Sequence, residues 1–164
     1  MESWIAYISV GSNLGDRLEN CRRGIQLLTQ GNARLKAESR IYETEPVDFA
    51  DQDWFINCVV QIETVFDPHQ LLHRIKEIQH ATGRNHDAIR FGPRILDLDI
   101  IFYDDRVINS RQLTIPHPRM HTRRFVLKPL CDIDPTIKHP VLKKDVQSLL
   151  NNLDDNEQRI IEYR

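Results

Sequence analysis

The sequence has few cysteines, and they are not spaced to hold a metal or a disulfide framework. Its three cysteines, Cys21, Cys58 and Cys131, are an odd number and include no C-x-x-C pair. Disulfide-rich secreted domains and zinc knuckles need paired or closely spaced cysteines. We therefore expect reduced thiols and a cytoplasmic location.

Long apolar runs, a leader segment and a strong excess of charge are lacking as well. No run approaches the roughly 20 apolar residues that a membrane helix needs, and residues 1–4 have neither the basic patch nor the apolar stretch of a signal peptide. The net charge is −2 and the isoelectric point is near 6.4, whereas nucleic-acid-binding domains commonly lie above about 9. These absences predict a soluble protein without nucleic-acid or membrane partners.

Repeats, low-complexity tracts and Gly/Ser linkers are absent from the 164 residues, which predicts a single domain over 1–164. Apolar and alternating runs predict strands over 4–10, 34–43, 54–66 and 95–103, and helical spacing predicts helices over 15–29 and 67–83. The order β-α-β-β-α-β predicts a ferredoxin-like α+β fold, with an antiparallel sheet flanked by helices in αβα layers.

The rest of the chain is expected to contribute loops and short elements. Two polar loops, 44–53 and 84–94, are longer than the usual ~4–6 residues, and long loops are often functional. Beyond the fourth strand we expect the return of a hairpin over 106–109 and a helix over 123–131 that is interrupted near Pro129. A short helix over 146–150 and a short strand near Ile160 complete the prediction.

Two carboxylates stand out on the predicted strand 95–103. Asp97 and Asp99 are two residues apart and so point to the same face, while Leu96, Leu98 and Ile100 point to the other, into the core. Two close like charges repel, and a Mg²⁺ ion, which prefers oxygen ligands, relieves that repulsion. An isolated D-x-D pair is also compatible with an exposed, solvated strand face.

Basic residues near this pair favour a phosphate ligand. Residues 84–128 hold nine Lys or Arg and five Asp, which makes the middle of the chain basic on an otherwise acidic body. Arginine forks and histidine donors beside metal-binding carboxylates suit a triphosphate. The segment 11–16 contains glycines but no Walker A lysine, so it reads as a tight turn. His117 and His121 lack the partners of a zinc site.

An amide beside an aromatic ring suggests recognition of a heterocycle. Asn57 shares a strand face with Phe55 and could read the edge of a ring that stacks on the phenylalanine. Phe125 could supply the opposite wall of such a site. The alternatives are an Asn bonded to the backbone at a sheet edge and a Phe in the core.

Four blocks of the sequence resemble one enzyme family. The run 91–101, Phe-Gly-Pro-Arg-Ile-Leu-Asp-Leu-Asp-Ile-Ile, resembles the signature of the 6-hydroxymethyl-7,8-dihydropterin pyrophosphokinases of folate biosynthesis. The blocks 7–15, 42–57 and 116–130 resemble the opening strand and turn, the pterin loop and strand, and the late loop and helix of the same family. Order and spacing agree from about residue 5 to residue 140.

The resemblance implies a monomeric ferredoxin-like enzyme that transfers pyrophosphate from ATP to the pterin hydroxymethyl group and releases AMP. It implies two Mg²⁺ ions on Asp97 and Asp99, and a catalytic set of Asp97, Asp99, Arg94 and Arg123. The implied pterin-binding residues are Thr44, Pro46, Val47, Phe55, Asn57 and Phe125. The implied ATP-binding residues are Leu72, Gln79, His86, Phe91, Arg94, Ile100, Thr114, His117 and Arg123.

Some residues depart from the family pattern. Glu45 stands where the family often has Pro, and Gln79 stands where it often has Glu. His86 and Phe91 stand where some members have Arg and Trp. These departures leave open a second hypothesis, a catalytically weakened paralogue that binds pterin or nucleotide. A third hypothesis, a ferredoxin-like RNA-binding module, is disfavoured by the net charge and by the two acids on the strand.

Overall fold

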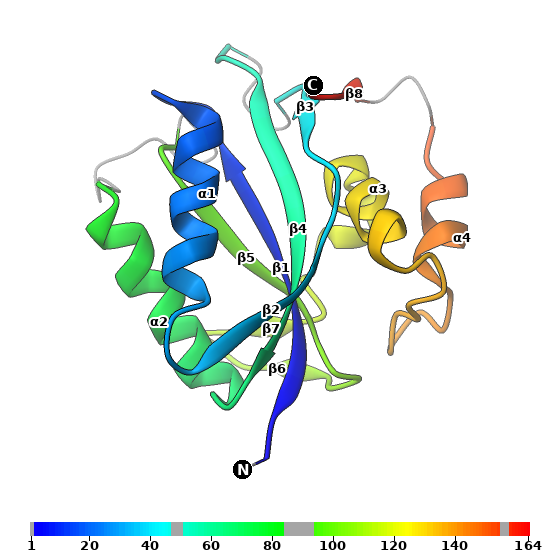
Figure 1. Ribbon diagram of the computed structural model, residues 1–164. Coiled ribbons are helices and arrows are strands. Elements are labelled where there is room, and N and C mark those ends of the chain that lie inside the picture. Colours follow the sequence, from blue (N-terminus) through cyan, green and yellow to red (C-terminus); the bar gives the residue numbers. More distant parts are fainter. Residues whose placement is uncertain (1, 47–50, 84–93, 155–157) are drawn as a thin grey trace.

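The protein is an α+β sandwich in which one antiparallel sheet lies between two pairs of helices (Figure 1). The structure is a computed structural model that describes residues 2–46, 51–83, 94–154 and 158–164. Helices α1 (Arg17–Leu28) and α2 (Pro68–Ala81) cover one face of the sheet, and α3 (Arg124–Ile133) and α4 (Val146–Asn151) cover the other. No helix among these residues has the length and apolar character to cross a membrane.

The sheet has the strand order of a ferredoxin-like fold. The central strand β1 (Trp4–Ser12) pairs with β5 (Asp97–Tyr103) on one side and with β4 (Phe55–Thr64) on the other. Strand β4 in turn pairs with β2 (Ala33–Glu38) and β3 (Tyr42–Thr44), and β8 (Ile160–Glu162) lies outside β3. With β2 and β3 counted as one bent strand, the predicted β-α-β-β-α-β fold is confirmed.

Local sequence signals account for the helix and strand boundaries. The Asp67 carboxylate accepts a hydrogen bond from the Gln70 amide, and the Gln70 Oε1 accepts one from the Asp67 amide, which makes a capping box at the start of α2. Gly83 follows the helix with a φ of 96°, a conformation that glycine adopts without strain. Strand β1 is buried on both faces because helices cover both, and it therefore reads as a continuous apolar run.

Three predictions about local structure were wrong. The strand expected over 34–43 breaks into β2 and β3, because the Ser39 hydroxyl, not a backbone carbonyl, accepts the hydrogen bond of the Val59 amide. The segment expected as a hairpin return, β6 (Ile108–Asn109), pairs with β7 (Thr114–Ile115) in a separate two-stranded sheet. Helix α3 continues through Pro129, which is buried, to Ile133.

Two hydrophobic clusters hold the layers together. One lies between the sheet and the pair α1/α2 and includes Ile8, Cys58 and Leu98. The other lies between the sheet and the pair α3/α4 and includes Tyr7, Val59 and Leu127. Since neighbouring residues of a strand point to opposite faces, these clusters assign each strand side chain to one helical layer.

Candidate active site

The candidate site lies on the α3 side of the sheet, where the central strand brings two predicted half-sites together. Gly11 of β1 pairs with Asn57 of β4 on one side and with Asp97 of β5 on the other. Strands in a sheet are spaced about 4.8 Å apart, so the amide and the carboxylate are carried on backbones about 10 Å apart. Asn57 alternates with Ile56 and Cys58, which pack against α1 and α2, and so points toward α3.

The amide half of the site is buried and held in one orientation. Asn57 and Thr44 are 5% and 1% exposed, and the Asn57 Nδ2 donates a 2.6 Å hydrogen bond to the Thr44 hydroxyl. A Cβ built on Gly11 would overlap the Asn57 Oδ1, so this side chain lies directly over the glycine. The absence of a side chain at residue 11 therefore makes room for the Asn57 amide.

The carboxylate half lies on the outer strand of the sheet. Asp97 and Asp99 are half-buried, whereas Leu96, Leu98 and Ile100 are at most 5% exposed and face α1 and α2. The two acids thus occupy one face, next to Gly11 and Ser9 of β1. Oxygen donors two residues apart on a strand fit the preference of Mg²⁺, which is commonly held by one or two carboxylates and completed by waters and phosphates.

Gln79 fixes the backbone between these two acids. Its side chain is 6% exposed, and its Oε1 accepts a 2.9 Å hydrogen bond from the Leu98 amide, which points outward from the edge of β5. An unsatisfied amide at this buried edge would be costly. The structure therefore gives Gln79 a role in holding the strand that carries Asp97 and Asp99.

His117 lies beside the carboxylate half as a neutral hydrogen-bond donor. Burial, with the positive charge of Arg123, lowers its pKa to about 4, against an opposing effect of Asp97. The His117 Nδ1 accepts a 3.1 Å hydrogen bond from the Arg119 amide. A neutral ring with an accepting Nδ1 carries its proton on Nε2, so this side chain offers one N–H donor at neutral pH.

Helix α3 begins at the edge of the site with a cation and a ring. Arg123 precedes the helix, and its guanidinium lies 5.4 Å from the centroid of the Phe125 ring. Phe125 is half-buried and packs against the core cluster on the α3 side. This segment thus presents an aromatic face and a positive charge on the side of the sheet that carries Asn57 and Asp97.

Asn13 joins the two long loops, a role that the sequence did not suggest. Its Nδ2 donates to the Gln52 Oε1 at 2.8 Å and to the Asp53 carbonyl at 3.0 Å. Its Oδ1 accepts from the Arg94 amide at 2.7 Å, and its amide donates to the Arg94 carbonyl at 3.0 Å. The only sequence signal was the turn cluster at 11–16, which says nothing of distant partners.

The other predicted residues lie around this centre or outside the described part of the chain. Leu72 and Ile100 pack in or against the core on the α1/α2 side, and Thr114 is exposed in β7. Pro46 follows β3 and is half-buried. Val47, His86 and Phe91 fall outside the described residues. Within the described ranges, no three His, Cys, Asp or Glu side chains form a metal-binding group.

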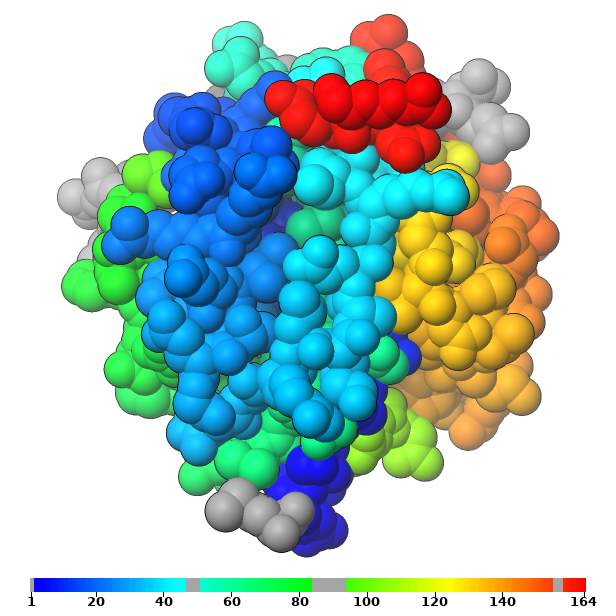
Figure 2. All heavy atoms as spheres, in the orientation of Figure 1, coloured from blue at the N-terminus to red at the C-terminus, as the bar shows by residue number. Residues whose placement is uncertain are grey.

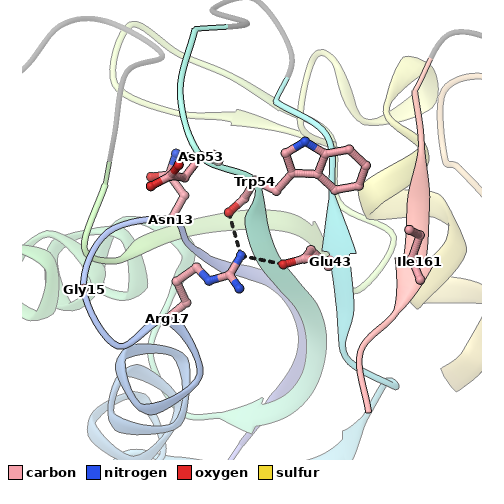
Figure 3. A pocket seen from close by; sticks show the side chains of 7 residues that line it. All are labelled: Asn13, Gly15, Arg17, Glu43, Asp53, Trp54 and Ile161. Carbon is pink, nitrogen blue, oxygen red and sulfur yellow. Dashed lines mark hydrogen bonds and ion pairs between the residues drawn. The ribbon is translucent and has the colours of Figure 1, made fainter.

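A polar cavity of about 590 Å³ is lined by residues that include Asn13, Arg17 and Glu43 (Figure 3). Arg17 crosses it, with a 2.9 Å hydrogen bond to the Trp54 carbonyl and a 2.8 Å ion pair with Glu43. Glu43 pairs in register with Ile56, which belongs to the α1/α2 cluster. The cavity therefore opens on the opposite face of the sheet from Asn57.

The fold and the site define a ferredoxin-like protein with a buried amide and a carboxylate pair on one sheet face. Residues 7–135 match the family described as 7,8-dihydro-6-hydroxymethylpterin-pyrophosphokinase. The chain belongs to this family.

Curated relatives cover most of the chain. The chain is 45% identical over 130 residues to the 2-amino-4-hydroxy-6-hydroxymethyldihydropteridine pyrophosphokinase of Bacillus subtilis. The matched region covers 79% of this chain and 77% of that protein. The chain is 40% identical over 151 residues to the folic acid synthesis protein fol1 of Pneumocystis carinii. That match covers 92% of this chain but only 20% of the fungal protein, so the chain corresponds to one part of that larger relative.

Solved structures agree on the fold. A crystal structure of HPPK-DHPS from Plasmodium falciparum superposes with a TM-score of 0.74 at 19% identity, over 92% of this chain and 45% of that one. At this identity the superposition supports the architecture alone.

Proposed function

We propose that this chain transfers the pyrophosphate group of ATP to the hydroxymethyl group of 6-hydroxymethyl-7,8-dihydropterin and releases AMP. Family membership supports the reaction. The observation that carries the proposal is the register at Gly11, which sets the Asn57 amide and the Asp97 carboxylate on either side of one strand position. A heterocycle read by the amide would then extend its substituent toward the carboxylates.

In this proposal the pterin binds at the buried amide half. Asn57 and Thr44, linked by their hydrogen bond, read the edge of the ring, together with the backbone near Pro46 and Val47. Phe55 and Phe125 stack on its two faces. A buried amide with both donor and acceptor functions suits a ring that itself presents donors and acceptors, because a mismatched ring would leave buried groups unpaired.

The nucleotide binds on the carboxylate side, and its phosphates lie over β5. Asp97 and Asp99 would hold two Mg²⁺ ions, which would neutralise phosphate charge and orient the reacting oxygens. Arg94 and Arg123 add permanent positive charge, and the His117 Nε2–H donates to a phosphate oxygen or the nucleotide. Gln79 and Thr114, together with His86 and Phe91, line the rest of the nucleotide site. Leu72 and Ile100, which lie on the α1/α2 side of the sheet, contact the nucleotide where it passes the outer edge of β5.

The chemistry is an in-line displacement. The hydroxymethyl oxygen attacks the β-phosphorus and forms a new O–P bond. At the same time, the β-phosphorus loses its bond to the oxygen that bridges it to the α-phosphorus. AMP leaves with that oxygen, and the proton of the attacking hydroxyl passes to solvent. Positioning and charge neutralisation supply most of the catalysis in such a reaction. Arg94 and Arg123 stabilise the charge on the transferred group.

The same proposal covers the setting in which the protein acts. The three cysteines of the chain are unpaired thiols, which supports a reducing, cytoplasmic compartment. The two hydrophobic clusters share one sheet, which supports a single pyrophosphokinase domain over 1–164. We propose a monomer whose partners are its two small-molecule substrates, without nucleic acid or membrane.

Mass analysis of the products tests the function directly. The purified chain is incubated with ATP, Mg²⁺ and the dihydropterin, and we expect AMP and a pyrophosphorylated pterin in equal amounts. Asp97→Asn and Asp99→Asn, which keep the shape and remove the charge, are the controls and should lack product. Formation of ADP would indicate a simple kinase. Pterin binding without any product would support the weakened paralogue instead.

A further inference from the structure

The C-terminal strand β8 lies along β3, outside the part of the chain that matches the family. The family match ends at residue 135, whereas β8 spans Ile160–Glu162. Its residues pair antiparallel with β3, and Ile160 lies opposite Thr44, whose hydroxyl holds the Asn57 amide. Figure 2 shows the red C-terminal segment lying along the cyan part of the chain that contains β3. The last strand of the protein thus borders the residues proposed to bind the pterin.

Glu45, the first residue after β3, is bound to this segment by both its backbone and its side chain. Its amide donates to the Arg159 carbonyl at 2.9 Å, and its carboxylate accepts from the Arg159 amide at 2.9 Å. Its carbonyl accepts a 2.6 Å hydrogen bond from the Gln158 side chain. The Arg159 guanidinium completes the contact with a 3.7 Å ion pair to the same carboxylate.

Arg159 also contacts the other end of the loop that Glu45 begins. Its guanidinium lies 5.0 Å from the centroid of the Trp54 ring, and Trp54 directly precedes β4. Figure 3 shows the indole on the side of the cavity that also carries Glu43 of β3 and Ile161 of β8. One residue of the C-terminal segment therefore bridges the start and the end of the 45–54 loop.

The identity of residue 45 makes this bridge possible. A proline there, as the resemblance leads one to expect, has no amide hydrogen to donate to the Arg159 carbonyl and no carboxylate to accept from the Arg159 amide. Proline at residue 45 would therefore remove two of the hydrogen bonds to the C-terminal segment, of which only the bond to the carboxylate requires the glutamate side chain. The ion pair alone would contribute little, because the Arg159 side chain is largely exposed and the Glu45 side chain is partly exposed.

We propose that Gln158 and Arg159, acting through Glu45 and Trp54, are positioning residues that hold Thr44 and Phe55, the chain neighbours of Glu45 and Trp54, in place to bind the pterin. This inference rests on the proposed function, since it assigns Glu45 to the pterin half of that site. When only a fraction of molecules has these residues correctly placed, the apparent affinity for the ligand is the intrinsic affinity multiplied by that fraction. Removing the bridge should therefore weaken pterin binding and leave the nucleotide half unchanged.

Substitutions at residue 45 separate the backbone from the charge. Glu45→Pro removes the amide donor and the carboxylate together, and we expect the KM and the Kd for the pterin to rise about 30-fold, the weight of two net hydrogen bonds. The KM for ATP should stay within twofold. Glu45→Gln keeps the amide and an acceptor oxygen, so it should restore pterin binding to near the wild-type value.

The matched control, Glu162, lies on the C-terminal strand β8. Glu162→Gln removes the 3.9 Å ion pairs that Glu162 makes with Arg40 and Arg164, without touching the 45–54 loop. It should change neither substrate's KM. Arg159→Met, which keeps much of the side-chain length and removes the charge over Trp54, provides a second test if Glu45→Pro fails to fold. We expect it to raise the pterin KM selectively, by a smaller factor.

Pterin binding by fluorescence titration is measured beside turnover, so that two failures can be told apart. A wild type that neither binds the pterin nor releases AMP overturns the proposed function and this inference with it. An active wild type with an unchanged pterin KM and Kd in folded Glu45→Pro overturns only the inference. Equal effects of Glu45→Pro and Glu162→Gln, or an equal rise in both KM values, would also overturn it.

Discussion

Substitution of Gly11 by alanine should disable the pterin half of the site while leaving the fold intact. Residue 11 lies near the end of the central strand β1, and the side chain of Asn57 lies directly over it. An alanine Cβ would come closer to the Asn57 Oδ1 than van der Waals contact allows. The amide must therefore retreat by about 1 Å to reach an ordinary contact distance.

The structure sets the size of the effect. Overpacking a dense core by one methyl group costs about 1–3 kcal/mol of stability, and loss of the hydrogen bond from Asn57 to Thr44 costs about 1 kcal/mol. A stable domain survives this. Catalysis is more sensitive, because a 1 Å misplacement of a substrate-positioning group can lower the rate about 100-fold. We expect kcat/KM for the pterin to fall by about that factor.

The assay follows AMP release at varied pterin and ATP concentrations, with urea unfolding to measure stability. Gly24→Ala is the matched control, because its Cβ would come within 2.8 Å of the Leu96 side chain, on the opposite face of the sheet. It adds the same methyl group to a crowded position, and the ends of a leucine side chain can move. The control should keep its pterin kcat/KM within about threefold of the wild type.

A folded Gly11→Ala protein with wild-type pterin kinetics would refute this reasoning. It would mean that Asn57 can move without consequence and therefore does not read the pterin. A fall in activity that is equal in Gly24→Ala would point instead to a general effect of crowding on the sheet.

Three further predictions address the metal, the loops and the response to pH. Asp97→Asn and Asp99→Asn should each lower AMP formation at least about 100-fold, because a metal ligand is lost. Each should also raise stability in the absence of Mg²⁺, because one of two repelling charges is gone. Wild-type rates of either variant in a Mg²⁺ titration would contradict the first expectation. Asn13→Ala removes three side-chain hydrogen bonds, so the free energy of unfolding measured in urea should fall by about 2–3 kcal/mol. The KM should rise for both substrates. A rise for one substrate alone would argue against a shared anchor for the loops. Burial, with the neighbouring His121, lowers the pKa of His139, so the unfolded chain binds more protons than the folded chain once the pH falls below about 6.5, and stability should decline there. His139→Asn, which keeps an acceptor near the position of Nδ1, should flatten this decline in stability between pH 7.5 and pH 5. An unchanged slope would refute the assignment to His139.

The parts of the fold that the sequence predicts are those governed by local chemistry. The Asp67 cap, the alternation along 54–66 and the glycine at residue 83 each fix an element through contacts within a few residues. The break between β2 and β3 depends on the Ser39 hydroxyl meeting the Val59 amide 20 residues away. Pairing across that distance leaves no periodic signal in either segment.

Some features of the candidate site can likewise be predicted from one segment of the sequence, and others depend on distant segments. The period of a strand is enough to put Asp97 and Asp99 on one face, and the structure has them there. The register that brings Asn57 and Asp97 to either side of Gly11 is a property of three strands together, so no single segment encodes it. The partners of Asn13 are 39 to 81 residues away, and only the folded chain brings them together.

These distant contacts bear on how the two halves of the site could be tuned separately. The carboxylate half depends on β5, whose outer edge is held by Gln79, and the amide half depends on β3, whose outer edge is held by the C-terminal strand. Both outer strands connect to long loops, and Asn13 ties those loops to the central strand. A change at Gln79 should therefore affect the nucleotide side first, and a change at Glu45 the pterin side first, whereas a change at Asn13 should affect both. Two departures from the family pattern, at residues 45 and 79, thus act on opposite edges of one sheet.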